Sequence, residues 1–533
     1  MLRLTNLSVP LDYTESSLRA LLLKKLKLVP DQLLSFSVSR RSIDARNKQD
    51  VHFVLSVDLS VRDENLLLRK NRNLSRIQAA PAKKLPEFRA ADSGAKPAPL
   101  VVGAGPAGLF AALTLARAGA KPVLIERGKP VDLRTQDISV LQAEGLLDPD
   151  SNVQFGEGGA GAFSDGKLTC GIKSPHIRTI LDTFVAHGAP EEILIDQKPH
   201  IGTDRLKGVV ASIRKEIVSL GGTVLFYTRL EELIIRGGQV AGAVVSSSGE
   251  KQEFLTDTIL LCIGHSARDT VQQLFNQGIR MIQKPFAMGV RIEHPRSMID
   301  RSQYGSFAGH PALGAASYKL ICHTPDGRGV YTFCMCPGGE VIAAASQPGG
   351  VVTNGMSLHA RDGRNSNAAL LVGVRPEDFG DTHPLAGFVL QRSIEKAAWK
   401  AGGGSFVAPA QRVEDFLSGR PSSSFGEVLP SYRPGVVPAD LRAVLPPWIT
   451  ENLKKGIRAM NSQLSGFAMP DAVLTAPETR SSSPVRFCRT PLGEAEDYRG
   501  LYPVGEGAGY AGGIVSAAAD GITAALRVLE NRS

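Results

Sequence analysis

Three glycines with the spacing Gly-x-Gly-x-x-Gly constrain the fold of this chain more than any other feature. They are Gly103, Gly105 and Gly108. A short apolar run precedes them, an alanine-rich segment follows at residues 109–118, and a second apolar run ends in Glu126. This order predicts a strand, a tight turn, a helix and a second strand, which together make half of a dinucleotide-binding fold.

Each residue type in this turn has a physical task. Gly103 permits a sharp exit from the strand, Gly105 leaves room for a pyrophosphate, and Gly108 lets the helix approach the sheet. The first amides of the helix have no intrahelical partner and attract phosphate. We therefore expect the cofactor phosphates to contact Gly103, Gly105, Pro106, Ala107 and Gly108.

An acidic residue closes the second predicted strand. Glu126 follows Gly103 by 23 positions, where its carboxylate can accept hydrogen bonds from both ribose hydroxyls of an adenosine. We assign Arg127 and Arg134, in the polar segment that follows, to the same cofactor site.

Length and composition indicate a globular protein of two or three domains. The chain has 533 residues, of which 43% are hydrophobic and 21% charged. Arg117 and Asp520 interrupt the most apolar helical segments, so no membrane span is expected. The N-terminus lacks a signal-peptide pattern and the six cysteines do not suggest a disulfide framework, so we expect a cytoplasmic protein.

The positive charge is concentrated near the N-terminus. The net charge is +9, and residues 1–96 hold 18 of the 61 Lys and Arg residues but only 10 of the 52 acidic residues. Apolar alternation and a helical leucine pattern predict a small β-α-β-β module over residues 1–78. Its basic face is either a solvated surface, the simpler interpretation, or a docking site for an anion such as RNA.

A second glycine-rich stretch lies at residues 156–161. It matches the Gly-x-Gly-x-x-Gly spacing, but no apolar helix and no closing acid follow, so we reject it as a second nucleotide fingerprint. Backbone without side chains can approach a flat ligand such as an isoalloxazine ring, and we assign Gly158 and Gly159 to the cofactor site. Further along, a buried strand ends at Gly264, which we place on the adenosine side of the cofactor.

The chain returns to a strand, glycine turn and helix at its C-terminal end. Gly505 lies 402 positions after Gly103, and the chain ends too soon for another β-α-β unit. A cofactor that spans the sheet needs such a split arrangement, which suits FAD better than NAD. We expect Glu506 to meet a ribityl hydroxyl, and the amides of Gly512, Gly513 and Ile514 to face the flavin O2/N1 edge.

These elements predict an α/β protein. Its Rossmann-like FAD-binding domain is interrupted by a mixed α+β substrate domain and preceded by the small β-α-β-β module. The predicted divisions are residues 1–78 for the basic module, 79–98 for a linker, 99–284 for the first part of the FAD-binding domain, 285–485 for the substrate domain, and 486–533 for the return segment.

The chain resembles the glutathione-reductase-like FAD superfamily, and more closely a family of uncharacterised FAD-dependent dehydrogenases. The resemblance rests on residues 103–108, 152–161, 163–168, 263–270 and 502–514, and it covers essentially the whole chain. It implies FAD as the cofactor and implies no substrate. The chain lacks the motifs of related FAD enzymes whose chemistry is known. It has no redox Cys-x-x-Cys or Cys-x4-Cys motif, no Trp-x-Trp halogenase signature and no second complete fingerprint for NADPH.

We therefore predict an FAD-dependent oxidoreductase that transfers hydride or electrons between flavin and a small molecule, with NAD(P)H as a candidate donor. The alternatives are an RNA-binding or RNA-modifying flavoprotein and a noncatalytic FAD-bound regulator. His265 follows the buried strand and is the candidate catalytic residue, although a histidine that opens a helix is often structural.

Two further groups of residues could carry chemistry. Lys284, Arg291, Glu293 and His294 share one segment, where Arg291 and Glu293 either bind an anionic substrate or, more simply, pair with each other. Cys334 and Cys336 lie two residues apart, with Cys322 and His323 upstream. Three interpretations are open for these residues: a zinc site, a redox thiol pair near the flavin, or small buried side chains. The Cys-x-Cys spacing is unusual for zinc, so we predict no metal.

Overall fold

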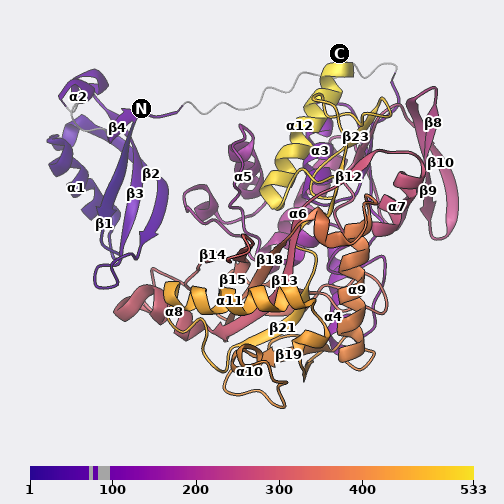
Figure 1. Cartoon of the computed structure of the whole chain (residues 1–533). Helices are drawn as coiled ribbons and strands as arrows, with labels where there is room; N and C mark the ends of the chain where they lie inside the picture. The colour runs from indigo at the N-terminus through magenta and orange to yellow at the C-terminus, as the bar shows by residue number, and fades with distance from the viewer. Residues whose placement is uncertain (71–75, 82–95, 533) are drawn as a thin grey trace.

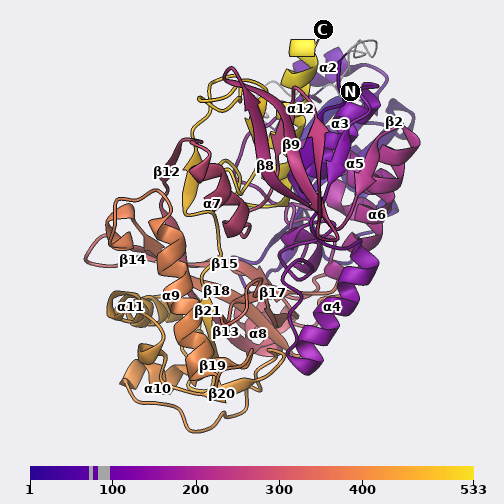
Figure 2. The same ribbon diagram turned by 90° about the vertical axis from the view of Figure 1, so that its right-hand side faces the viewer.

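The computed structural model describes residues 1–70, 76–81 and 96–532. The small N-terminal module stands beside the main body, whose upper part holds a parallel sheet and whose lower part holds a larger sheet (Figures 1 and 2). Most of the predicted linker, residues 82–95, lies outside the described residues.

The N-terminal module is built on a four-stranded antiparallel sheet in the order β2-β3-β1-β4. Its elements are β1 (Leu2–Val9), α1 (Glu15–Leu26), β2 (Leu33–Asp44), β3 (His52–Val61), α2 (Glu64–Lys70) and β4 (Ile77–Ala79). The predicted β-α-β-β order is present, and α2 and β4 complete a split β-α-β topology. The sequence prediction missed β4 because it is three residues long and depends on pairing with Leu2–Leu4 of β1.

One edge of the module contacts the main body. On β2, the Arg41 backbone amide donates to Ile195 O at 2.7 Å, and Gln197 N donates back to Arg41 O at 2.9 Å. The Arg41 guanidinium also donates to Asp196 Oδ1 at 2.8 Å. The edge strand is thus paired with a loop of the main body rather than left open.

A five-stranded sheet in the order β23-β11-β5-β6-β7 forms the centre of the nucleotide-binding part. Every neighbouring pair is parallel. Its strands are β5 (Leu100–Val102), β6 (Val123–Ile125), β7 (Thr223–Leu225), β11 (Ile259–Leu261) and β23 (Leu501–Pro503). One hydrophobic core joins this sheet to α3 (Pro106–Arg117), α5 (Ile177–Ala186), α6 (Thr203–Ser219) and α12 (Ile514–Arg532). Helix α4 (Val131–Glu144) belongs to a separate cluster with residues of the intervening segment.

The two glycine turns converge in this sheet. The strand before each turn, β5 or β23, pairs with β11, so the turns lie at the carboxyl edge on either side of one strand. Helices α3 and α12 lie side by side in both views (Figures 1 and 2). Their contact is close enough that a Cβ at Gly521 would stand 2.1 Å from Ala107 O. The predicted convergence is confirmed.

Two smaller sheets border this domain. One is an antiparallel meander of β8 (Thr228–Arg236), β9 (Gln239–Ser247) and β10 (Glu250–Leu255), which precedes α7 (Arg268–Asn276). The other pairs β12 (Met281–Gln283) with β22 (Val485–Phe487). Strand β12 precedes the intervening segment and β22 follows it, so the chain leaves the nucleotide-binding part and returns to it at this two-stranded sheet.

The intervening segment is organised around a seven-stranded sheet in the order β14-β15-β18-β13-β21-β19-β20. Its strands are β13 (Phe286–Pro295), β14 (Ile321–His323), β15 (Gly329–Cys336), β18 (Asn365–Val374), β19 (Ala408–Arg412), β20 (Val436–Pro438) and β21 (Val473–Glu478). The accompanying elements are α8 (Arg296–Tyr304), β16 (Glu340–Ala343), β17 (Thr353–Met356), α9 (Ala386–Ala401), α10 (Val413–Ser418) and α11 (Pro447–Gln463). Arg291 and Glu293 of the central strand β13 are fully buried.

Across the part of the chain that the structure describes, none of the helices combines the length and the apolar character needed to cross a bilayer.

Candidate cofactor and substrate site

A single cavity of about 1020 Å³ lies at the carboxyl edge of the parallel sheet. Its lining includes the loops after β5, β11 and β23, and residues of β15 and β21 from the seven-stranded sheet. Ligands of open parallel sheets bind at this edge. This volume is at the upper end of the range of roughly 300–1,000 Å³ that is typical of pockets for small molecules and cofactors.

The fingerprint turn forms one end of the cavity. Gly103, Gly105, Pro106 and Ala107 line it, as predicted from the sequence. Gly103 has a φ of +101°, which favours glycine. Gly108 lies behind the lining, because a Cβ there would stand 1.8 Å from Gly103 O. Gly108 therefore closes the turn rather than facing a ligand.

Glu126 lines the cavity at the end of β6 and is held by backbone. Its carboxylate accepts the amides of Ala104 (2.8 Å), Gly128 (3.0 Å) and Gly156 (2.9 Å). A carboxylate offers about four acceptor positions. About one position therefore remains for a ribose hydroxyl, rather than the two that the sequence suggested.

The two predicted arginines differ in position. Arg127 lines the cavity, and its guanidinium is fixed by Asp150 (2.7 Å) and Asp269 (2.8 Å). Arg134 is fully buried outside the lining and donates to the carbonyls of residues 152, 153, 156 and 157. Its role in the structure is to shape the glycine-rich loop.

That glycine-rich loop packs directly against the fingerprint turn and continues the wall of the cavity. Gly159 lines the cavity, and a Cβ there would stand 3.1 Å from the Cα of Gly105. Gly158 stands behind it, since its amide donates to Ala104 O (2.8 Å) and an added Cβ would meet Ala162 at 2.7 Å. Two backbone segments without side chains thus face each other.

The C-terminal turn closes the other side. Gly264, Glu506, Gly512, Gly513 and Ile514 line the cavity. The Gly512 amide is occupied, since it donates to Ser516 Oγ at 3.1 Å. The first turn of a helix leaves amides without intrahelical partners, so Gly513 and Ile514 are better placed to meet a ligand.

Gly505, like Gly108, Arg134 and Gly158, was predicted to bind the cofactor but lies outside the cavity lining. Its φ is +81°, and an added Cβ would meet Ala107 Cβ of α3 at 2.9 Å. Gly505 therefore allows the two glycine turns to pack against each other.

His265 lines the cavity but is poorly suited to carry a proton. Burial, followed by the positive charges of Arg480 and Arg268, lowers the pKa of His265 to about 3. Its Nδ1 lies 3.3 Å from Ser266 Oγ, and its Nε2 lies 3.8 Å from Glu506 Oε1. The imidazole is therefore neutral near pH 7, and it can donate or accept only as a neutral ring.

Glu506 is a better match for proton transfer near neutral pH. Burial raises the pKa of Glu506 to about 7, and the positive charge of Lys284 opposes this shift. Burial also lowers the pKa of Lys284, which lines the same wall. A group whose pKa lies near the working pH is suited to general acid–base catalysis. The sequence showed the position of Glu506 but not its perturbed ionisation.

We expect Glu506→Gln to increase stability in alkaline solution more than in acid. Because the folded-state pKa of Glu506 lies above its unfolded value, the wild type loses stability as pH rises from about 4.3 to 7. The glutamine variant lacks this loss. In urea denaturation, the unfolding free energy of the variant should exceed that of the wild type by more at pH 8 than at pH 5. Glu496→Gln, at an exposed position, serves as the control. An advantage of the same size at both pH values would contradict the assignment.

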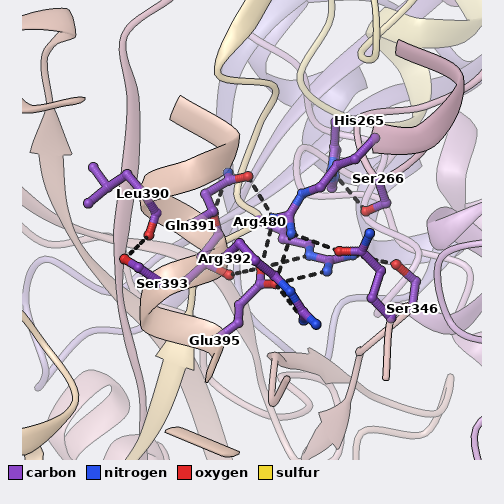
Figure 3. A network of polar contacts seen from close by, with 12 residues as sticks. His265, Ser266, Ser346, Leu390, Gln391, Arg392, Ser393, Glu395 and Arg480 are labelled. Atoms are coloured by element: carbon purple, nitrogen blue, oxygen red, sulfur yellow. Dashed lines mark hydrogen bonds and ion pairs between the residues drawn. The ribbon is translucent and has the colours of Figure 1, made fainter. Parts of the chain in front are cut away.

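A buried charge network supports the wall near His265 (Figure 3). Glu395 is fully buried, and its carboxylate accepts from Arg268 (2.8 Å) and Arg480 (3.0 Å). Arg480 lines the cavity, and its Nη1 also donates to Ser346 Oγ at 2.6 Å. Two buried guanidinium groups thus share one carboxylate, which leaves net positive charge beside the cavity.

The outer part of the cavity is also positive. Lys198 and Lys319 line it beside Ser317, and Lys198 Nζ donates to Ser317 Oγ at 3.0 Å. Within residues 1–70, 76–81 and 96–532, neither lysine forms an ion pair with a carboxylate. Deeper in the cavity, Asp165 is already paired with Lys167 (3.2 Å) and Arg361. This part of the site therefore suits an anion.

Arg291 and Glu293 do not pair with each other. Arg291 Nη1 lies 3.2 Å from Glu478 Oε2, whereas Glu293 accepts from Ser431 Oγ at 2.5 Å. Neither residue lines the cavity, and His294 Nε2 donates to Phe467 O in the core. Glu478 does line the cavity, and burial, opposed by Arg291, raises the pKa of Glu478 to about 7. No local sequence pattern pointed to Glu478, because its partner Arg291 is 187 positions away.

The cysteines are distributed along one strand pair. Cys322 on β14 pairs with Val330, at the start of β15, whereas Cys334 and Cys336 lie at its end. Among the described residues, no group of three or more His, Cys, Asp or Glu side chains is placed to hold a metal ion.

The cavity fits a dinucleotide cofactor on structural grounds. A Cβ at Gly159 would crowd Gly105 Cα at 3.1 Å, Gly105 lines the cavity with bare backbone, and Glu126 keeps an acceptor position at the ribose end. A second helix N-terminus, at Gly513 and Ile514, closes the far side of the same cavity. The fold and this site define an FAD-binding flavoprotein of the oxidoreductase class.

Comparisons with known families agree with this class. An FAD binding domain matches residues 99–139, and the C-terminal-domain-like region of FAD-dependent proteins matches residues 285–481. A domain of unknown function, DUF8436, matches residues 1–60. An uncharacterized protein of Clostridium beijerinckii (strain ATCC 51743 / NCIMB 8052) is 45% identical over 530 residues, covering 99% of this chain and 98% of its own. The chain belongs to the family of this clostridial protein, and it is an FAD-dependent oxidoreductase.

Solved structures with partial similarity include two enzymes of low sequence identity. The 3-ketosteroid-Δ4-(5α)-dehydrogenase of Rhodococcus jostii is 14% identical, with 83% of this chain and 99% of that chain covered and a TM-score of 0.34. The L-amino acid deaminase of Proteus myxofaciens is 12% identical, with 85% and 95% covered and a TM-score of 0.34.

Proposed function

We propose that this FAD-dependent oxidoreductase acts on a small substrate with an anionic group, such as a carboxylate or a phosphate. One observation carries the proposal: a single cavity extends from the fingerprint turn to Lys198 and Lys319. The turn accounts for the cofactor, and the two lysines lie in a part of the cavity whose acid, Asp165, is already paired.

FAD, when bound, supplies the hydride or electron transfer, and the chain's own residues hold it and the substrate. Gly105 and the first amides of α3 support binding of the pyrophosphate, and Glu126 binds an adenosine hydroxyl. Gly513 and Ile514 present the N-terminus of α12 to the flavin end. Arg127 orders the adenosine side through Asp150 and Asp269.

In this proposal Glu506 manages a proton. Its carboxyl group lines the cavity, and its pKa of about 7 lets it exist in either form at neutral pH. Lys284, on the same wall, stabilises the ionised form. His265, with its pKa near 3, stays a neutral ring 3.8 Å from Glu506 Oε1 and does not act as the acid.

We also propose the domain division 1–78, 99–284 with 486–533, and 285–485. The pairing of β12 with β22 supports it, because both crossings between the two larger domains occur at this short sheet. No feature of the described residues and none of the comparisons favours the RNA-binding alternative.

The proposal is tested by anaerobic flavin reduction. The purified protein should carry flavin absorption bands, and stopped-flow mixing with NADH, NADPH and a panel of metabolites should bleach them. We expect the effective reductants among the metabolites to be anionic, and their reaction rates to fall as ionic strength rises. Equally fast reduction by neutral analogues of the same metabolites would contradict an anionic substrate.

We expect the double variant Lys198→Gln/Lys319→Gln to weaken substrate binding without loss of flavin. Removing two charges near an anion should raise KM by roughly tenfold, since each contact contributes about 0.5–1 kcal/mol at a partly exposed site. Steady-state kinetics with the reductant from the screen measures this, and Lys396→Gln/Lys400→Gln on α9 is the matched control. An unchanged KM would place the substrate elsewhere.

A further inference from the structure

Two cysteines at the end of β15 lie on an irregular piece of strand. Phe333 pairs with Ala369 and Cys336 with Asn367, so three steps along β15 match two along β18. This is a β-bulge, and Cys334 within it has a φ of +41°, a conformation that a residue with a side chain rarely adopts. Such local departures from regular geometry often mark functional sites.

The bulge brings the two thiols into contact and into different environments. Cys336 Sγ donates to the backbone oxygen of Cys334 at 3.3 Å, which makes the two side chains close neighbours. Cys334 lines the cavity, whereas Cys336 is fully buried just behind it. One thiol is therefore open to a small molecule in the cavity, and the other can reach only its neighbour.

Two cations face the buried thiol. Cys336 Sγ lies 3.6 Å from Arg291 Nη2 and 4.0 Å from Lys167 Nζ. The acids near them are Asp165, which pairs with Lys167, and Glu478, which pairs with Arg291.

The surrounding charges stabilise one thiolate on the pair. The neighbouring Cys334 thiol lowers the pKa of Cys336 most, and Lys167 and Arg291 lower it further against burial and Asp165. The Cys336 thiol and burial raise the pKa of Cys334. The two thiols therefore titrate as one pair, and when one proton is lost the remaining proton can reside on either sulfur.

We propose that Cys334 and Cys336 form a redox-active dithiol, which small disulfides entering the cavity oxidise to an intrachain disulfide. This inference does not rest on the proposed oxidoreductase reaction or on bound FAD. It stands on the two neighbouring cysteines of the bulge, on the two cations beside Cys336 and on the opening of Cys334 to the cavity.

The step follows ordinary thiol–disulfide exchange. The thiolate of Cys334, formed when Cys336 holds the shared proton, attacks one sulfur of the small disulfide and releases one thiolate. The released thiolate takes the proton of Cys336, which then attacks Cys334 Sγ and expels the second thiolate. Two protein sulfurs are oxidised, and one small disulfide is reduced to one thiol and one thiolate, which takes up a proton from water.

The test uses the full-length, reduced protein and oxidised glutathione. After exposure and alkylation under denaturing conditions, mass spectrometry should show two thiols lost and a peptide carrying a disulfide between Cys334 and Cys336. In Cys336→Ser we expect a stable glutathione adduct on Cys334, since no second thiol can displace it. Cys334→Ser should acquire no adduct on this strand. Cys170→Ser, a cysteine of the same cavity, is the control and should still form the disulfide.

A second measurement needs no cysteine variant. At pH 7, iodoacetamide should alkylate the Cys334–Cys336 pair, counted on either sulfur, roughly tenfold faster than Cys322, because the pair holds a thiolate whereas burial raises the pKa of Cys322. Lys167→Gln should slow this alkylation by removing one cation. The proposal is overturned if glutathione leaves both thiols free in the wild type, if the adduct forms on Cys170 instead, or if Lys167→Gln leaves the rate unchanged.

Discussion

Replacing Gly105 by alanine should abolish most FAD binding and leave the fold intact. A Cβ at Gly105 would have only the Cα of Gly159, at 3.9 Å, as a neighbour, and Gly105 has a φ of −75°, which any residue adopts. The polypeptide therefore tolerates the methyl group. In the proposed complex the same methyl group would hold the pyrophosphate away from the first amides of α3.

The expected loss in affinity is roughly 100-fold. Two hydrogen bonds to a charged phosphate contribute about 1.5 kcal/mol each at the low end of their range, and their sum of about 3 kcal/mol corresponds to that factor. Fluorescence titration of the flavin-free protein with FAD measures the change, and urea denaturation of the same preparation checks the fold.

Gly208→Ala provides the matched control for this experiment. Gly208 lies on α6, and a Cβ there would have no atom within 4 Å. Its FAD affinity should equal that of the wild type. Full affinity in Gly105→Ala would show that the phosphates do not approach this turn, and the cofactor assignment of residues 103–107 would fail with it.

The second large effect concerns Glu395 in the network of Figure 3. Glu395→Gln keeps the size of the side chain but leaves Arg268 and Arg480 without a counter-charge in the core. Removing one partner of a buried ion pair typically costs about 3–5 kcal/mol of unfolding free energy. We expect a loss of that order in urea denaturation at pH 7.

The loss should also depend on pH in a defined direction. Arg480 and Arg268 outweigh burial and hold the pKa of Glu395 well below its usual value. The ionised carboxylate therefore contributes stability above the unfolded pKa of about 4.3, and this contribution declines as pH falls below that value. The difference between wild type and Glu395→Gln should shrink in acid.

Two variants make this result decisive. Glu496→Gln removes a carboxylate from an exposed pair with Arg280 and should change the unfolding free energy by less than about 1 kcal/mol. Arg480→Met, added to Glu395→Gln, should restore part of the lost stability, because it removes one of the uncompensated charges. A cost below 1 kcal/mol for Glu395→Gln alone would mean that water or an anion already screens the two arginines.

The sequence determined the nucleotide-binding half of this protein, because its signals are local. The spacing of Gly103, Gly105 and Gly108 and the acid at Glu126 encode a turn and a strand end within one short segment. The glycine turn at Gly505 has the same local character, and its distance from Gly103 indicated a cofactor that spans the sheet. Twelve of the sixteen predicted cofactor residues line the cavity.

Only the tertiary structure showed which side chains face the cavity and in which state of charge. Gly108, Arg134, Gly158 and Gly505 satisfy the sequence pattern but serve backbone packing behind the lining. The pKa of Glu506, the Arg480–Glu395 pair and the cations around Cys336 depend on partners far away along the chain. Burial and long-range pairing set these properties, and neither leaves a periodic or local pattern in the sequence.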